Sequence, residues 1–246
     1  MLLIYIVCAT VAGGALSLLG ATLLTLGFSR NLLSRLVSFS VGVLLATVFL
    51  NVLPEALAQS EDHAGVLAAI LVGLIGFFLL EKFVLWRHSH EPEAGDAGGH
   101  TGFLILIGDG VHNFADGILI AAAFLTDPML GLTTAVAVIA HEIPQEMGDF
   151  LILLNAGYSR TKAFWLNLAS SLASVVGGVL GYFMLNKTSS LLPYILALAA
   201  ASFIYIAVAD LMPGMNKRWE TRATLWQLVL IASGVGLVVG QRALFG

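Results

Sequence analysis

The chain has 246 residues, of which 59 % are hydrophobic and 11 % charged, whereas an ordinary soluble domain carries about 25 % charged residues. So few charges cannot cover the surface of a soluble protein of this size, which excludes a soluble globular enzyme and favours a polytopic membrane protein. The single cysteine, Cys8, excludes a disulfide framework within the chain. A net charge of −4 without basic clusters gives no support to nucleic-acid binding.

Hydrophobic stretches of about 20 residues recur along the chain, separated by short polar breaks, and each could cross a bilayer as a helix. We therefore predict an all-α membrane protein with eight transmembrane helices that form a single transmembrane domain over residues 1–246. The predicted spans are Leu3–Gly27, Leu36–Leu57, Gly65–Trp86, Gly102–Leu125, Leu130–Leu154, Ala163–Leu185, Leu191–Leu211 and Ala223–Val239.

The basic residues predict the orientation, because Lys and Arg accumulate in cytoplasmic loops. The loops after spans 1, 3, 5 and 7, together with the end of span 3, hold Arg30, Arg35, Lys82, Arg87, Arg160, Lys162, Lys217, Arg218 and Arg222. The opposite loops hold only Lys187 and Arg242. This asymmetry predicts that both termini lie outside the cytoplasm, in a multi-pass protein of the plasma (inner) membrane.

Spans 2 and 7 share a short pattern near their ends. Asn51 lies three residues before Pro54, and Asp210 lies three residues before Pro213. Since the two spans would cross the membrane in opposite directions, a true match would relate halves of inverted topology, as in many secondary transporters. The alternative is that both prolines simply end helices, and the sequence leaves both readings open.

Ionisable and amide side chains within the predicted spans are concentrated in spans 4 and 5, although each ionisable one costs about 2.5 to 3.5 kcal/mol on insertion scales. Span 4 carries a stripe on one helix face: Asp109, His112, Asn113 and Asp116. Span 5 carries His141, Glu142, Gln145, Glu146 and Asp149. Pro144 lies among them and predicts a kink, because proline lacks a backbone donor.

Two imidazoles, an amide and several carboxylates make a nitrogen and oxygen ligand set. Such a set suits Zn²⁺, Fe²⁺ or Mn²⁺ rather than Cu⁺. The lack of cysteine among these residues argues against a closed structural zinc site. The sequence therefore predicts a divalent-metal site between spans 4 and 5.

An enzymatic alternative comes from residues 141–145, which read HEIPQ. They begin like the H-E-x-x-H signature of zinc proteases, but Gln145 replaces the second histidine. The alternative is an intramembrane metal-dependent hydrolase with Glu142 or Glu146 as the general base, and a metal sensor is a third reading. We predict that the protein is not an enzyme.

The motifs of spans 4 and 5 resemble the paired signatures of the ZIP family of divalent-metal transporters. Residues 109–117 read DGVHNFADG and residues 141–149 read HEIPQEMGD, close to the family patterns HNFxDG and HExPHExGD. The resemblance implies a 3+2+3 arrangement in which inverted repeats flank spans 4 and 5. It also implies alternating-access transport of zinc into the cytoplasm, and Fe²⁺, Mn²⁺ and Cd²⁺ accept the same ligands. The expected partners are divalent metal ions and lipid, with no cofactor and with a homodimer left open.

Position by position, the resemblance implies that the metal residues are His112, Asn113, Asp116, His141, Glu142 and Gln145. The first metal would bind His112, Asp116 and His141, and the second would bind Asn113 and Glu142. Gln145 stands where many members have a bridging Glu or a His. Span 6 has no acid where some members place a further ligand, and Ser174 is the expected occupant there. We therefore expect one tightly held metal ion.

Two polar loops could contact the metal on its way. Residues 88–101 are predicted to form a flexible cytoplasmic loop in which His88, His90 and His100 bind metal weakly. Acidic residues and a histidine in the outward loop after span 2 could gather cations at the mouth: Glu55, Glu61, Asp62 and His63. The alternative for both loops is a merely solvated segment.

Overall fold

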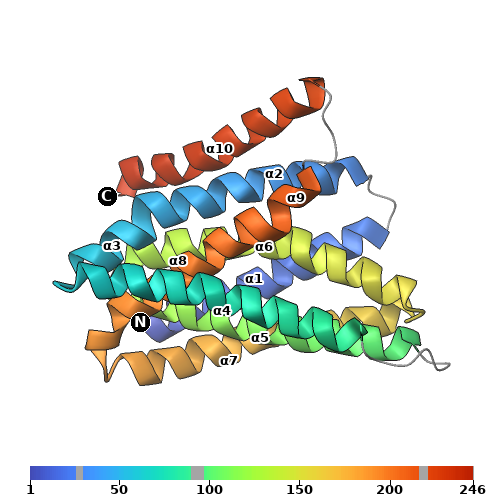
Figure 1. Ribbon diagram of the computed structural model, residues 1–246, viewed down its shortest axis with the longest axis horizontal. Helices are drawn as coiled ribbons and strands as arrows, with labels where there is room; N and C mark the ends of the chain where they lie inside the picture. The colour runs from blue at the N-terminus through green and yellow to red at the C-terminus, as the bar shows by residue number, and fades with distance from the viewer. Residues whose placement is uncertain (26–29, 90–96, 216–220, 246) are drawn as a thin grey trace.

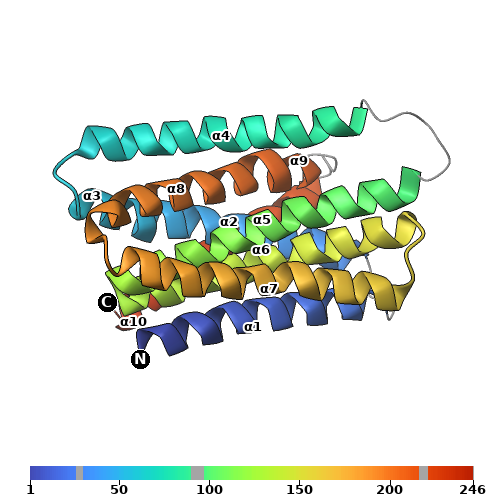
Figure 2. The same cartoon turned by 90° about the horizontal axis from the view of Figure 1, so that it is seen from below.

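The computed structural model describes residues 1–25, 30–89, 97–215 and 221–245. Within these ranges the chain forms helices joined by short turns, and no strand is present among them. The helices run roughly along the longest axis of the molecule, and the two ends of the chain lie at the same end of the bundle (Figure 1, Figure 2). The predicted all-α fold class is confirmed.

The described elements are α1 (Leu2–Thr25), α2 (Arg30–Thr47), η1 (Val48–Val52), α3 (Leu53–Ala58), α4 (His63–Ser89), α5 (Ala97–Thr126), α6 (Pro128–Asn155), α7 (Arg160–Leu185), η2 (Ser189–Leu191), α8 (Leu192–Tyr205), η3 (Ile206–Leu211), α9 (Met212–Met215) and α10 (Thr221–Phe245). Each predicted span falls on one of these helices or on a continuous run of them, except that residues 26 and 27 of the first span lie outside the described residues. The predicted loop 88–101 overlaps the end of α4 and the beginning of α5, and its residues 90–96 lie outside the described residues.

Six helical segments of the described chain are long and apolar enough to cross a bilayer by length and composition. They are Leu2–Gly20, Ser34–Ala58, His63–Leu80, Arg160–Leu185, Leu192–Met215 and Arg222–Leu244. Helices α5 and α6, which carry the polar side chains of predicted spans 4 and 5, are not among these six segments. With 30 residues, α5 is nevertheless about 45 Å long, more than the roughly 30 Å of a hydrocarbon core.

Helix α5 packs most extensively against α7, and glycine makes this close approach possible. A Cβ atom on Gly117 of α5 would lie 1.9 Å from the carbonyl oxygen of Ser174. One on Gly177 of α7 would lie 2.0 Å from the carbonyl oxygen of Phe114. Only a residue without a side chain fits at either position, so the two backbones touch next to the polar stripe of α5.

The helices pack in two pairs of similar contacts, one pair involving α5 and α6 and the other involving α2 and α8. Helix α1 packs on α6, and α7 packs on α5. Helix α10 packs on α2, whereas α4 packs on α8. Figure 1 shows α10 at the edge of the bundle, and Figure 2 shows α4 at another edge. Helices α5 and α6 each pack against several other helices, although Val111 of α5 and Leu132 of α6 stay exposed on the outside of the bundle.

The proline-containing ends of predicted spans 2 and 7 have the same local structure. In the first, α2 passes into the π-helical segment η1, which contains Asn51, and then into α3 with Pro54 in its first turn. In the second, α8 passes into the π-helical segment η3, which contains Asp210, and then into α9 with Pro213. The wider π-helical bonds keep the chain helical ahead of a residue that lacks a backbone donor.

Candidate metal site

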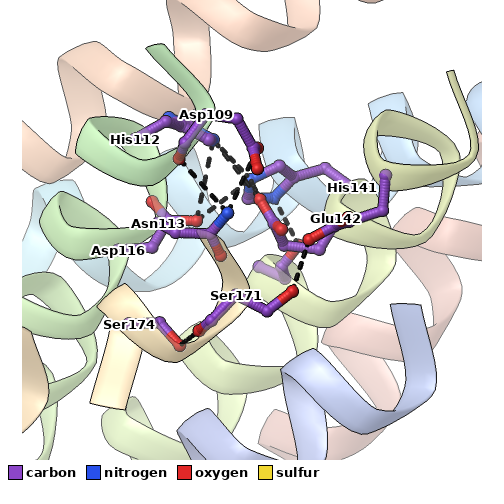
Figure 3. A network of polar contacts seen from close by, with 10 residues as sticks. Asp109, His112, Asn113, Asp116, His141, Glu142, Ser171 and Ser174 are labelled. Atoms are coloured by element: carbon purple, nitrogen blue, oxygen red, sulfur yellow. Dashed lines mark hydrogen bonds and ion pairs between the residues drawn. The ribbon is translucent and has the colours of Figure 1, made fainter. Parts of the chain in front are cut away.

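Four side chains from α5 and α6 converge inside the bundle (Figure 3). One ligand atom from each of His112, Asp116, His141 and Glu142 lies within 4.8 Å of all the others. We call these four residues the mixed cluster, because they combine two imidazoles with two carboxylates. His112 and Asp116 lie one turn apart on α5, and His141 and Glu142 are adjacent on α6, so one close helix pair supplies the whole cluster.

The distances within the mixed cluster are short. The Nε2 atoms of His112 and His141 are 3.2 Å apart, and His141 Nε2 is 3.1 Å from Asp116 Oδ2. Glu142 Oε1 lies 3.5 Å from each of the two Nε2 atoms. His112 Nε2 is 3.8 Å from Asp116 Oδ2. A cation at the centre of these atoms would be within reach of nitrogen and oxygen donors at once.

The ring of His141 is held in one orientation by its surroundings. Its Nδ1 atom is 3.0 Å from the carbonyl oxygen of Ala137, which can only accept, so the Nδ1–H donates to it. In the neutral ring, the lone pair of Nε2 then points into the mixed cluster. Metal-binding histidines commonly make such a second bond to a backbone carbonyl. Phe203 of α8 packs edge-on against the ring, with 5.8 Å between the centroids.

Burial makes the carboxylates of the mixed cluster costly without a cation. Asp116 and His141 are 0 % exposed, Glu142 is 3 % exposed and the His112 side chain is 17 % exposed. Neither oxygen of Asp116 has a hydrogen-bond donor, and Oε1 of Glu142 has none. Buried charged oxygens are normally paired or bound to a metal. The arrangement is therefore suited to a divalent cation.

A second group of acidic side chains adjoins the first. Ligand atoms of Asp109, Glu142 and Glu146 lie within 4.8 Å of one another, and all three residues are buried. We call these residues the carboxylate cluster, which shares Glu142 with the mixed cluster. Ser171 of α7 donates a hydrogen bond of 2.5 Å to Glu146 Oε1, while Oε2 of Glu146 and Oδ2 of Asp109 have no partner. Oxygen donors alone suit harder or more weakly held cations.

Only some of the metal residues predicted from the sequence lie together in the structure. It brings together His112, Asp116, His141 and Glu142, whose role as ligands stays a prediction. The amide nitrogen of Asn113 instead donates to the carboxylate of Asp109 at 3.1 Å. Gln145 is half-buried, and its side chain faces Asp109, so it adjoins the carboxylate cluster.

Two features were missed by sequence reasoning. Neither Asp109 nor Glu146 is among the metal residues that the family resemblance implies, yet the structure brings their carboxylates together. On α7, Ser170 faces Asp109 and Ser171 donates to Glu146, whereas the expected Ser174 donates to the carbonyl of Ser171 at 2.7 Å (Figure 3). The spacing of Asp109 from His112 and Asp116 was the available signal, whereas nothing in the sequence relates Ser171 to Glu146.

A polar cleft of about 490 Å³ opens where α3, the start of α6 and the end of α10 meet. Asn51, Glu55, Asp127 and Arg242 contribute its polar lining. Of the predicted mouth residues, Glu55 lines this cleft. Asp62 is engaged elsewhere, since it accepts bonds from the Gly65 amide at 2.8 Å and the Tyr194 hydroxyl at 3.1 Å.

The chain is similar in sequence to known zinc transporters. The profile of a family described as ZIP zinc transporter matches residues 1–102 and 87–241. Zinc transporter ZIP13 of Pongo abelii is 32 % identical over 225 residues, which cover 84 % of this chain and 66 % of that protein. Zinc transporter YKE4 of Saccharomyces cerevisiae is 31 % identical over 244 residues, covering 84 % of this chain and 69 % of that protein. Zinc transporter foi of Drosophila melanogaster is 38 % identical over 138 residues, covering 56 % of this chain and 19 % of that protein.

Proposed function

Because the chain belongs to the ZIP zinc transporter family, we propose that it carries zinc across a membrane into the cytoplasm by alternating access. The observation that carries the proposal is the convergence of two imidazoles and two buried carboxylates between α5 and α6. The relatives are named as transporters, so the protein is a transporter rather than an enzyme, and the hydrolase alternative is not favoured.

In the proposed membrane arrangement, α5 and α6 are two further spans, which brings the number to eight. Their polar faces would be shielded from lipid by the surrounding helices. The correspondence between the contacts of α1 with α6 and of α7 with α5 supports an inverted repeat around this pair. The matching π-helical segments before Pro54 and Pro213 support the same 3+2+3 symmetry.

The proposed orientation places both termini outside the cytoplasm and can be tested by labelling. In a Cys8→Ser background, Gln59→Cys should react with a membrane-impermeant thiol reagent from outside, and Arg160→Cys only from the cytoplasmic side. Both residues are exposed in short turns or at a helix start. The asymmetry of Lys and Arg between the two sets of loops motivates the test. Reversed labelling would contradict the orientation.

The two clusters suggest the order of events during transport. With the proposed orientation, the cleft beside Glu55 and Asp127 opens outward, and its acids would attract the cation. The mixed cluster would bind the dehydrated ion. Asp109 and Glu146 lie nearer the cytoplasmic ends of α5 and α6 than His112 and His141 do, so the carboxylate cluster would receive the ion on its way inward.

Zinc is the proposed substrate because two imidazoles favour it over magnesium or calcium, which prefer oxygen ligands. Fe²⁺, Mn²⁺ and Cd²⁺ stay further candidates with the same ligand preferences. The plasma (inner) membrane stays the predicted location, and a homodimer stays a prediction to be measured by light scattering.

Zinc flux into proteoliposomes provides the test of this function. Purified full-length chain is reconstituted, zinc is added outside, and an enclosed fluorescent zinc indicator reports entry. We expect a zinc-dependent signal with the wild-type chain that disappears with Asp116→Ala at equal reconstituted protein. A wild-type signal no greater than that of empty liposomes would refute transport.

A further inference from the structure

Pro144 leaves a backbone carbonyl next to the mixed cluster without its helical donor. In an α-helix, a carbonyl accepts a bond from the N–H four residues later, so Ala140 would need the N–H that Pro144 lacks. Ala140 directly precedes His141 in α6. Ala140 is half-buried within the bundle, and a carbonyl shielded from water without a donor is costly, so this position favours a partner from elsewhere.

That partner comes from α2. The hydroxyl of Ser40, which is 0 % exposed, donates a hydrogen bond to the carbonyl oxygen of Ala140. The same hydroxyl is 2.9 Å from the carbonyl of Leu36 in its own helix. The Leu36 carbonyl already has the Ser40 backbone N–H as its helical donor. Since a hydroxyl carries one proton, the Ala140 carbonyl is the acceptor that needs it.

We propose that Ser40 is a positioning residue for metal binding. Its bond to Ala140 fixes the segment of α6 that carries His141, so that Nε2 faces the mixed cluster. Phe203 of α8 packs against the His141 ring, so two helices outside the α5–α6 pair hold this histidine. A shift of α2 relative to α6 would thereby move a proposed ligand.

This inference rests on the proposed function, since it requires His141 to bind the transported metal. The outer-shell role that it gives Ser40 predicts weaker metal binding when the hydroxyl is lost, without loss of the fold. Removing such an outer-shell partner typically lowers metal affinity about 10- to 100-fold. The lower end of this range is expected here, because Ser40 acts through the backbone and not on the ring itself.

Helix α2 offers a matched control. Ser38 lies two residues before Ser40, is 1 % exposed, and donates at 3.0 Å to the carbonyl of Ser34 in its own helix. Ser38→Ala and Ser40→Ala therefore each remove one buried serine hydroxyl from α2. They differ in that Ser40 reaches across to α6.

The experiment measures Co²⁺ binding to the purified full-length chain by absorption spectroscopy, because Co²⁺ reports nitrogen and oxygen ligands directly. Ser40→Ala should weaken Co²⁺ binding about tenfold. Ser38→Ala should change it by less than about twofold, the usual scatter for independent sites. Size-exclusion chromatography of each variant checks that it is folded. Equal effects of Ser38→Ala and Ser40→Ala would overturn the proposal.

A double-mutant cycle gives the sharper result. Pro144→Ala restores an N–H for the Ala140 carbonyl, so Ser40→Ala in that background should weaken Co²⁺ binding by less than about twofold. A full tenfold loss in both backgrounds would overturn the role of Ser40. The transport proposal is judged separately: Co²⁺ binding without zinc flux in liposomes would refute transport while the cycle still decides the role of Ser40. Wild-type Co²⁺ binding no tighter than that of His112→Ala would refute both.

Discussion

The mixed cluster and the carboxylate cluster share Glu142, yet they differ in chemistry and in hydrogen bonding. The mixed cluster has two imidazoles, and neither oxygen of Asp116 has a hydrogen-bond donor. In the carboxylate cluster, Ser171 and Asn113 already donate to Glu146 and Asp109. Zinc should therefore be held more strongly by the first group, because its two imidazoles are strong nitrogen donors for this ion and the second group offers oxygen alone. The difference predicts strong binding at one cluster and transfer through the other.

The largest effect should come from the mixed cluster. His141→Ala is expected to lower zinc uptake by about a hundredfold or more, above the 10- to 100-fold typical of losing only an outer-shell partner. His112→Ala and Asp116→Ala should act in the same way, because each removes a donor from the convergent group. The measurement is initial flux into proteoliposomes at equal protein abundance. Wild-type flux in His112→Ala would mean that the stripe on α5 serves only packing.

The carboxylate cluster should respond more weakly. Glu146→Gln keeps the shape of the side chain but removes its charge, and we expect flux to fall about tenfold at saturating zinc. The zinc concentration at half-maximal flux should stay nearly constant, because the mixed cluster would still bind the entering ion. If the half-maximal zinc concentration instead rose by the same factor by which maximal flux falls, Glu146 would act in the entry step.

Two serines on α7 sharpen the same comparison. Ser171→Ala removes the donor to Glu146 and should lower flux about fivefold, the effect of a hydrogen bond worth about 1 kcal/mol. Ser174→Ala should leave flux unchanged, since its hydroxyl donates within α7. Similar flux in the two variants would indicate that Ser171 does not act through the carboxylate cluster.

The smallest change concerns the number of bound ions. We expect about one tightly held zinc ion per wild-type chain after desalting, because the mixed cluster has the stronger donors. Gln145→Glu would place a further carboxylate beside Asp109 and should raise retention towards a second ion. Elemental analysis measures both values in a chain in which His88, His90 and His100 are replaced by alanine. A wild-type value near two would show that the carboxylate cluster already binds zinc tightly.

The sequence was sufficient for much of the fold. Apolar runs of bilayer length mark the helices, since each helix must satisfy its backbone bonds internally and expose apolar side chains to lipid. The stripe of Asp109, His112, Asn113 and Asp116 was visible from helical spacing alone, because the 3.6-residue period places these positions on one face. The missing backbone donor at Pro144 follows from the chemistry of proline in the same way, whereas the kink expected there stays a prediction.

The sequence by itself determined which residues are polar within the apolar helices. Those residues indicate a membrane protein that offers nitrogen and oxygen donors to a metal ion. Only the tertiary structure decided which of those residues meet. Helical spacing relates positions within one helix, but the rotation and register of α5, α6 and α7 depend on packing, such as that at Gly117 and Gly177. The packing of α5, α6 and α7 brings Asp109 close to Glu146 and places Ser171, not Ser174, against Glu146. The packing of α2 on α6 brings Ser40 to the carbonyl that Pro144 leaves without a donor.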